Sequence, residues 1–271
     1  MRTVMRTRTR HLNILLVAVV VLFATAGCGL SSPPARVGEL LTKSESVELR
    51  DAESVQVEIN MAAGELAVSG GATELLEADF TYNVDELEPE VEYSGDTLTV
   101  STPDAGIRIG SLWDLDDYRY EWDMRFNNDV PMEMKVEVAA GTADLQLGSL
   151  SLTGLEIGTG ASDVKVDLSG SSSLTRLNVE TGIGRAAVDL SGNWQHNLDA
   201  NISSGVGELT LRLPNSVCVR VGVEEGLADV GTQGLTKDGS VYVNASCDAA
   251  EVTLRIDISA GLGAVNLEVE Q

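Results

Sequence analysis

Residues 157–166 read Ile-Gly-Thr-Gly-Ala-Ser-Asp-Val-Lys-Val, and variants of this phrase occur six times between Met132 and Gln271. Each phrase has an alternating apolar segment, two small or polar residues, a glycine, and a second alternating segment. The glycines are Gly141, Gly160, Gly182, Gly205, Gly226 and Gly261. They lie 19, 22, 23, 21 and 35 residues apart, and the last step indicates an insertion around Gly231 to Asp248. A period of about 21 residues is typical of repeat proteins, in which each unit buries its apolar face against its neighbours.

The apolar residues within each phrase alternate, as in Val164, Val166 and Leu168. Alternation places them on one face of a strand, and no window shows helical spacing. A unit of this length has room for two to three short strands joined by tight turns. We therefore predict an all-β β-solenoid of stacked short strands, with the glycines at sharp corners. A phosphate-binding glycine loop would need a following helix, and none is indicated.

The first 27 residues have the composition of an export signal. Four arginines precede an apolar run from Leu12, and Thr25-Ala26-Gly27-Cys28 ends it with small residues. We predict a signal helix over residues 1–27. The Cys28 context resembles a bacterial lipobox, which implies cleavage before Cys28 and lipidation, for example by palmitate. The alternative is an uncleaved membrane anchor. Both place the rest of the chain outside the cytoplasm, at a membrane.

The charge of the chain excludes one class of partner. The formal net charge is −24, and the 42 acidic residues all follow the signal segment. Such a surface repels nucleic acid and anionic lipid headgroups, so we expect no nucleic-acid partner. Solubility is the simpler explanation of the charge.

Two cysteines follow Cys28, and both lie near the insertion. In an exported chain, Cys218 and Cys247 are candidates for one disulfide, the alternative being two free thiols. The only histidine after the signal is His196, so we expect no metal site built on soft ligands and no cofactor.

The remaining segments suggest a modular organisation. Residues 28–48 form a predicted tether, and residues 49–103 form a first β region that repeats the strand–glycine–strand phrase. Residues 104–131 interrupt the period with an aromatic and acidic insertion, and residues 132–271 form the repeat domain.

The insertion has two interpretations. Its rings, Trp113, Tyr118, Tyr120 and Trp122, lie among carboxylates and are candidates for a sugar-binding platform. The alternative, which we favour, is a structural cap on the open end of the apolar ladder. A calcium loop at Asp114, Asp116 and Asp117 would lack the glycine and distal glutamate of an EF-hand.

A column of charged residues is predicted three positions after the repeat glycines. It would contain Asp144, Asp163, Arg185, Glu208 and Asp229. Its carboxylates, Asp144, Asp163, Glu208 and Asp229, are candidates for a shallow cation-binding or glycan-binding edge. A solvated polar corner, with Arg185 relieving the repulsion, is the simpler interpretation.

The segments Phe126–Gly141 (FNNDVPMEMKVEVAAG) and Leu150–Ala161 (LSLTGLEIGTGA) resemble the start of the toast-rack domain of bacterial envelope proteins. Val47–Val100 resembles its companion N-terminal unit. The domain occurs in LiaF-like cell-wall-antibiotic-response proteins and is similar to adhesin-type β-solenoids. The resemblance implies a β-solenoid and supplies no catalytic residues. LiaF-like proteins carry several membrane helices before this domain, whereas a lipoprotein-type signal precedes it here.

These features favour a non-catalytic, membrane-anchored lipoprotein that interacts with an envelope protein or glycan, as an adhesin-like module would. One alternative is an envelope-stress regulator that binds a membrane sensor protein. Another is a polysaccharide-acting solenoid enzyme, for which the sequence offers carboxylates but little else.

Overall fold

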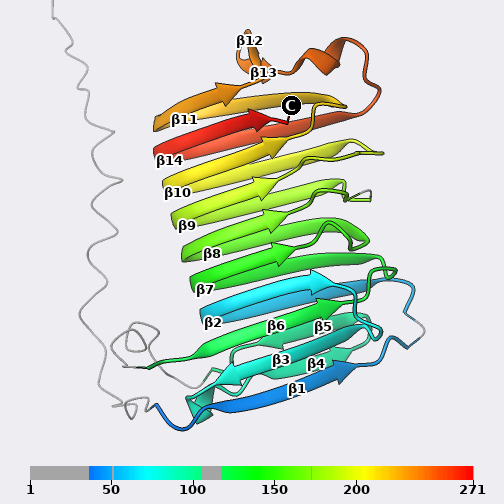
Figure 1. Ribbon diagram of the computed structural model, residues 1–271, viewed down its shortest axis with the longest axis vertical. Coiled ribbons are helices and arrows are strands. Elements are labelled where there is room, and N and C mark those ends of the chain that lie inside the picture. Colours follow the sequence, from blue (N-terminus) through cyan, green and yellow to red (C-terminus); the bar gives the residue numbers. More distant parts are fainter. Residues whose placement is uncertain (1–36, 51, 105–116, 172, 271) are drawn as a thin grey trace, which may run out of the picture. The chain divides into compact units, whose positions relative to one another are not determined.

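The computed structural model describes residues 37–50, 52–104, 117–171 and 173–270. The predicted signal segment and Cys28 lie outside the described residues. The described chain is almost wholly β-structure, and its strands form one sheet in the order β1-β3-β6-β2-β7-β8-β9-β10-β14-β11-β13-β12 (Figure 1). The predicted all-β solenoid is thus confirmed.

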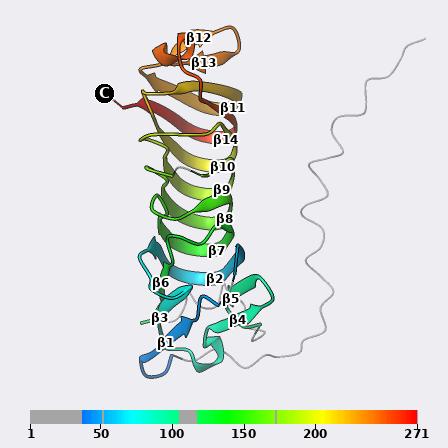
Figure 2. The same cartoon turned by 90° about the vertical axis from the view of Figure 1, so that its right-hand side faces the viewer.

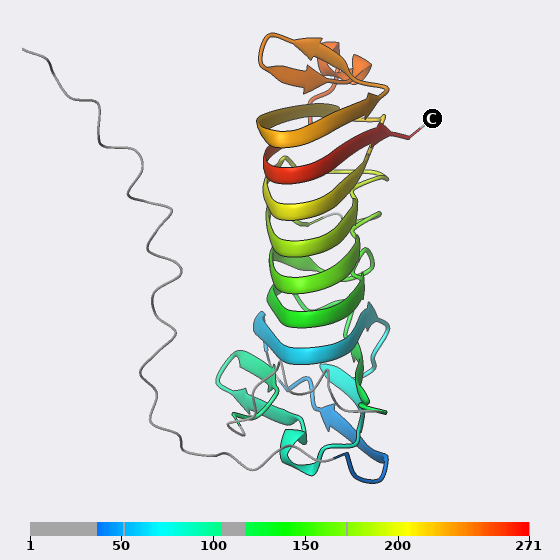
Figure 3. The ribbon, with the colours of Figure 1, turned by 90° about the vertical axis from the view of Figure 1, so that its left-hand side faces the viewer.

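Seven long parallel strands form the centre of the sheet, stacked one above another (Figure 3). We call each of these strands, together with the connector that follows it, a rung. In spatial order the strands are β2 (Val55–Gly70), β7 (Met132–Gln146), β8 (Leu152–Asp167), β9 (Arg176–Asp189), β10 (Leu198–Leu213), β14 (Thr253–Val269) and β11 (Cys218–Gln233). Since β2 pairs with β7 over most of its length, the first β region and the repeat belong to one continuous stack.

Each long strand bends near its middle instead of breaking into the short strands that we predicted. In β2 the buried positions are odd up to Ala63 and even from Leu66 onward. This change of phase turns both halves of the strand toward the same interior. The bend therefore replaces a turn, and the ladder of hydrogen bonds continues through it.

In five of the seven long strands the bend requires glycine for two reasons, whereas β8 has Ser162 and β11 has Ala228 at the same position. Gly64, Gly141, Gly184, Gly207 and Gly263 have φ between 123° and 152°, a region that side chains rarely allow. A Cβ at any of them would also overlap a carbonyl oxygen of the neighbouring strand.

Our alignment of the first repeat glycine was wrong. The register pairs Gly141 with Ser162 and not with Gly160, which lies against Ala139. The repeat glycine and the small residue two positions after it form two columns, with one column between them, and β7 has its glycine in the second of the two only.

The core is aliphatic and lies inside the bent strands. Ile59, Val136, Ile157, Val179 and their counterparts in the later rungs form one of the buried columns that run through the stack. Buried residues of the connectors close the open side of the rungs β7 to β10: Leu147, Leu150, Leu168, Leu174, Leu190, Trp194 and Val217.

The last two long strands are stacked out of sequence order. β14 lies between β10 and β11, so β11 is the outermost long strand (Figure 1). A physical reason lies in one core column, where β10 and β14 contribute Leu211 and Leu267 but β11 contributes the exposed Thr232. The more apolar strand occupies the interior position, where it is covered on both sides.

Shorter strands cover the ends of the stack (Figure 2), and at the β2 end β5 and β6 pair with β2 in parallel. At the β2 end they are β1 (Leu41–Val47), β3 (Leu76–Tyr82), β4 (Glu90–Ser94), β5 (Thr97–Ser101) and β6 (Tyr120–Phe126), with the 3-10 turn η1 (Asp85–Leu87). At the β11 end they are β12 (Thr236–Asp238) and β13 (Val241–Val243), followed by the 3-10 turn η2 (Ala245–Asp248). These last elements occupy the predicted insertion.

Candidate interaction surfaces

An acidic groove of about 1000 Å³ runs across the outer face of the second halves of the strands. We call it the outer groove. Its polar lining residues are Glu65, Asp79, Thr81, Glu121, Asp123, Thr142, Asp144, Asp163, Lys165, Arg185, Glu208 and Thr210. They come from β2, β3, β6, β7, β8, β9 and β10, so the ladder of the sheet sets their spacing. Seven carboxylates and two cationic side chains give the groove a strongly negative character.

Arg185 is the one arginine of the groove, and it is paired with Asp163. Its side chain donates to Asp163 Oδ2 at 2.6 and 3.2 Å, and its backbone N–H donates to Oδ1 at 3.0 Å. The hydrogen bonds from Arg185 lower the pKa of the Asp163 carboxyl. Arg185 is also paired in register with Glu208 of β10, so it lies between two carboxylates of neighbouring rungs. Hydrogen bonding to Asp163, helped by the charge of Glu208, raises the pKa of the arginine.

The structure brings three of the four predicted edge carboxylates into the outer groove but does not assemble them as a cation site. Asp144 pairs in register with Lys165, two residues beyond Asp163. Our alignment of Gly141 with Gly160 had placed Asp144 beside Asp163 instead. Asp229 is separated from Glu208 by Ala264 of β14, because the strand order differs from the sequence order. Within the described residues, no group of three or more His, Cys, Asp or Glu side chains could hold a metal ion.

The predicted aromatic platform is wrong for the two rings that lie deepest. Tyr120 and Trp122 are 2% and 1% exposed, since both point into the core from β6. The Trp122 ring packs edge-on against Phe80, with ring centroids 5.5 Å apart. Buried rings at the end of the stack are what the structural-cap interpretation predicts. Trp113 lies outside the described residues.

Tyr118 is only half-buried, but its hydroxyl is already used. It donates to the Ala63 carbonyl at 3.0 Å, and Tyr120 donates to Thr102 Oγ1 at 3.3 Å. Burial raises the pKa of both tyrosines, so both hydroxyls stay protonated at neutral pH. Tyr120 is therefore structural, and the half-buried Tyr118 ring stacks on it, with ring centroids 6.3 Å apart.

A second surface, an apolar ridge, follows the bend of the last rungs. Its residues are in register and exposed, from β9 to the end of the stack: Ile183 (62%), Val206 (45%), Leu262 (50%) and Leu227 (81%). Our sequence reasoning missed this ridge. The signal was present, because each of these residues directly follows a repeat glycine.

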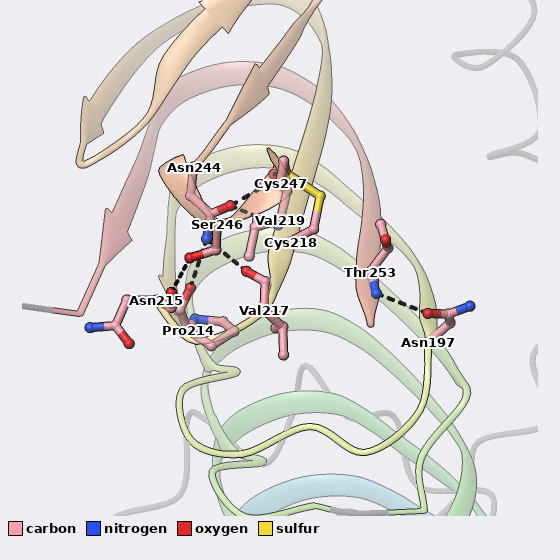
Figure 4. The surroundings of a disulfide bond; sticks show 10 residues. All are labelled: Asn197, Pro214, Asn215, Val217, Cys218, Val219, Asn244, Ser246, Cys247 and Thr253. Atoms are coloured by element: carbon pink, nitrogen blue, oxygen red, sulfur yellow. Dashed lines mark hydrogen bonds between the residues drawn. A yellow bond between two sulfur atoms is a disulfide. The ribbon is translucent and has the colours of Figure 1, made fainter. Parts of the chain in front are cut away.

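Cys218 and Cys247 form a disulfide that joins the start of β11 to η2 (Figure 4). Beside it, the buried Asn244 accepts a hydrogen bond from the Val219 N–H at 3.0 Å. Asn244 also donates to the carbonyls of Val217 and Pro214 at 2.8 and 3.3 Å. The two connections hold the insertion over the first half of β11.

His196 is exposed in the connector between β9 and β10. Among the described residues, no helix is long and apolar enough to cross a membrane.

The family of the chain follows from its sequence. The model described as the N-terminal domain of toast_rack, DUF2154, matches residues 36–175 and 171–212. Because these matches span more than half of the chain, the protein belongs to the toast-rack family. Among curated proteins, none matches it.

Solved structures give a consistent result. A crystal structure from Clostridium sporogenes, described as a "putative cell adhesion protein", matches with 29% identity and a TM-score of 0.64. The match covers 86% of this chain and 100% of the other. A "putative adhesin" from Bacteroides fragilis matches with 13% identity and a TM-score of 0.42, over 84% and 97% of the two chains. Of these two likenesses, the first is close enough to indicate a shared fold.

Proposed function

We propose that this chain is a non-catalytic adhesion module, held at the outside of a bacterial membrane by a lipid on Cys28. The observation that carries the proposal is the likeness, over 86% of this chain, to the structure from Clostridium sporogenes described as a "putative cell adhesion protein". The export signal and lipobox-like sequence around Cys28 support the lipid anchor. The anchor would leave the stack free to meet a partner in the envelope.

The outer groove is the surface that we assign to the partner. Its charges belong to paired strands, so their positions are fixed before binding and little conformational entropy is lost. Seven carboxylates favour a partner that presents cationic groups at a matching spacing. An envelope protein with exposed Lys or Arg residues meets that requirement better than a neutral glycan does.

Photocrosslinking from the full chain in its own cells tests this assignment. A photoreactive residue replaces Thr142, which is exposed in the groove, or Asn201, which is exposed on the outer face of the first half of β10. We expect mass spectrometry to find one recurrent partner from Thr142 and not from Asn201. Asp144→Lys combined with Glu208→Lys should abolish that crosslink. Equal crosslinking from both positions, or a crosslink indifferent to the charge reversal, would contradict the proposal.

The lipid anchor is tested separately by labelling cells with an alkyne-bearing palmitate analogue. We expect the protein to take up the label and Cys28→Ala to lose it, whereas Cys218→Ser with Cys247→Ser should keep it. Should the recurrent partner be a membrane sensor protein, the envelope-stress regulator would replace the adhesion module as the better function.

A further inference from the structure

The two ends of the stack are closed to different extents. At the β2 end, β5 pairs with the first half of β2 at Gln56–Asn60, and β6 pairs with the second half at Glu65–Gly70. At the β11 end, β13 pairs with Arg220–Gly222 only. Within the described residues, no strand pairs with the outer edge of Leu227–Gln233. The second half of β11 is therefore an open edge.

This edge has one charged side chain, Asp229, and lacks the other devices that usually prevent strand addition. An open edge presents unpaired N–H and C=O groups and is a template for another strand unless lysine, proline or a bulge blocks it. The segment Leu227–Gln233 reads Leu-Ala-Asp-Val-Gly-Thr-Gln, with no lysine and no proline. Its pairing with β14 runs without a register shift.

The side chains of the edge also lack cover. Leu227 is the most exposed member of the apolar ridge, at 81%. On the interior side, Val230 is half-buried and Thr232 is exposed, whereas their β14 neighbours Val265 and Leu267 are buried. One further strand paired with this edge would cover Leu227 on the outer side and Val230 and Thr232 on the interior side.

We propose that Leu227–Gln233 is a homophilic docking edge that pairs antiparallel with the same segment of a second copy. A two-fold axis at Val230 sets the register. Val230 then faces its own counterpart, and Asp229 faces Gly231 of the other copy. Leu227 faces Gln233, and Ala228 faces Thr232. This surface is distinct from the outer groove, and the inference does not depend on the proposed function.

The sequence of the segment is the reason for choosing a second copy as the occupant, because this register opposes no like charges. Like charges directly opposite one another destabilise a strand pair. In this register the one acidic residue of each strand faces a glycine, so the segment is compatible with itself. The β12–β13 hairpin lies over Arg220–Gly222, outside the seven paired residues.

The association should be weak and should strengthen with salt. Seven residues span only about 20 Å of strand, which buries less area than a standard stable interface. We expect a dissociation constant on the order of 10 μM to 1 mM. Each copy carries a formal net charge of −24, so the copies repel one another at low ionic strength and less so when salt screens them.

Gly231 allows a test of both the edge and its register. It does not have a positive φ, and a Cβ there would meet Asn266 Oδ1 at 3.3 Å, a flexible side-chain atom. Gly231→Asp should place a carboxylate opposite Asp229 and weaken the dimer. Gly231→Lys should place an ammonium group there and strengthen it. The two-fold axis makes the pair between positions 229 and 231 occur twice in the dimer. Each substitution should therefore change the dissociation constant by about 2- to 30-fold.

Sedimentation equilibrium of the full chain, in density-matched neutral detergent at about 0.05 and 0.5 M NaCl, measures this constant. Asn201→Asp and Asn201→Lys are matched controls, because Asn201 is an exposed residue of β10 outside the outer groove, and both edges of β10 are already paired there. We expect opposite effects at Gly231 and none at Asn201. A chain that stays monomeric, a dimer indifferent to both Gly231 substitutions, or one weakened by both would overturn the proposed pairing.

Discussion

The two ends of the stack are covered by different interactions. At the β2 end, two antiparallel ribbons cover both halves of the outermost rung, and the large rings Phe80, Tyr120, Trp122 and Phe126 are buried beneath them. At the β11 end, a short hairpin covers one half only, and η2 contributes no buried residue. Apolar burial closes the first end, whereas a disulfide and a buried asparagine hold the cover at the second.

This difference shows how a solenoid can end when apolar residues are few. The β12 strand is exposed along its whole length, and β13 is only half-buried. Such a cover gains little from the hydrophobic effect and cannot offset the entropy of ordering its own residues. A covalent link lowers that entropic cost, so the Cys218–Cys247 bond supplies at this end what aromatic burial supplies at the other.

The largest effect should come from opening the β2 end. Trp122→Ala would remove a fully buried ring and its edge-on contact with Phe80. We expect the free energy of unfolding to fall by about 3–5 kcal/mol. Chemical denaturation followed by circular dichroism measures the change, with Trp122→Phe as the matched control that keeps most of the ring contact. A loss below about 1 kcal/mol would show that this end is not closed by burial.

Removing the disulfide should have a somewhat smaller and more local effect. The bond closes a loop with a sequence separation of 29, for which the chain-entropy model gives about 3.5 kcal/mol. In the variant Cys218→Ser with Cys247→Ser we expect faster amide hydrogen exchange in β11, β13 and η2. Exchange in β2 and β6 should not change. Uniformly faster exchange would mean that the two ends are not independent.

Asn244→Ala tests the hydrogen bonds beside the disulfide. The substitution leaves the Val219 N–H and the carbonyls of Val217 and Pro214 without their present partner. We expect a loss of about 1–3 kcal/mol, the usual cost of unsatisfied buried polar groups. Ser246→Ala, which removes an exposed hydrogen bond to Asn215, is the control and should cost less. Equal losses would contradict a special role for Asn244.

The smallest effect concerns the middle of the stack, between the two ends. Because Arg185 lowers the pKa of Asp163 in the folded state, the pair stabilises the fold above the unfolded carboxyl pKa near 4. That contribution is lost as the pH falls through the lowered folded pKa. It should be small, since both side chains are largely exposed. In an NMR titration, Arg185→Ala should raise the Asp163 pKa, whereas Arg212→Ala should not.

Much of the architecture could be predicted from local patterns. The alternation of residues such as Val164, Val166 and Leu168 predicts strands, and the recurring glycine phrase predicts stacked units of about 21 residues. The location of the insertion also follows from spacing, and the export context made a bond between Cys218 and Cys247 a reasonable candidate. These features depend on residues that are close in sequence or on the redox compartment.

The register, the strand order and the burial of the aromatic rings could not be predicted from local sequence patterns. Two columns of small residues, two positions apart along each strand, allow more than one alignment of Gly141, and only the hydrogen-bonded ladder selects Ser162 as its neighbour. The outer groove depends on that register, so the sequence could indicate its residue types but not their grouping.

The sequence by itself thus determined an all-β repeat with glycine at its bends, because period and backbone conformation are local properties. Only the tertiary structure decided that β14 lies inside β11, because both strands fit the same ladder and differ in how much apolar surface they can bury. The same competition for interior positions buried Tyr120 and Trp122 and left Leu227–Gln233 at an open edge. Burial is a property of the whole stack, and no single repeat contains it.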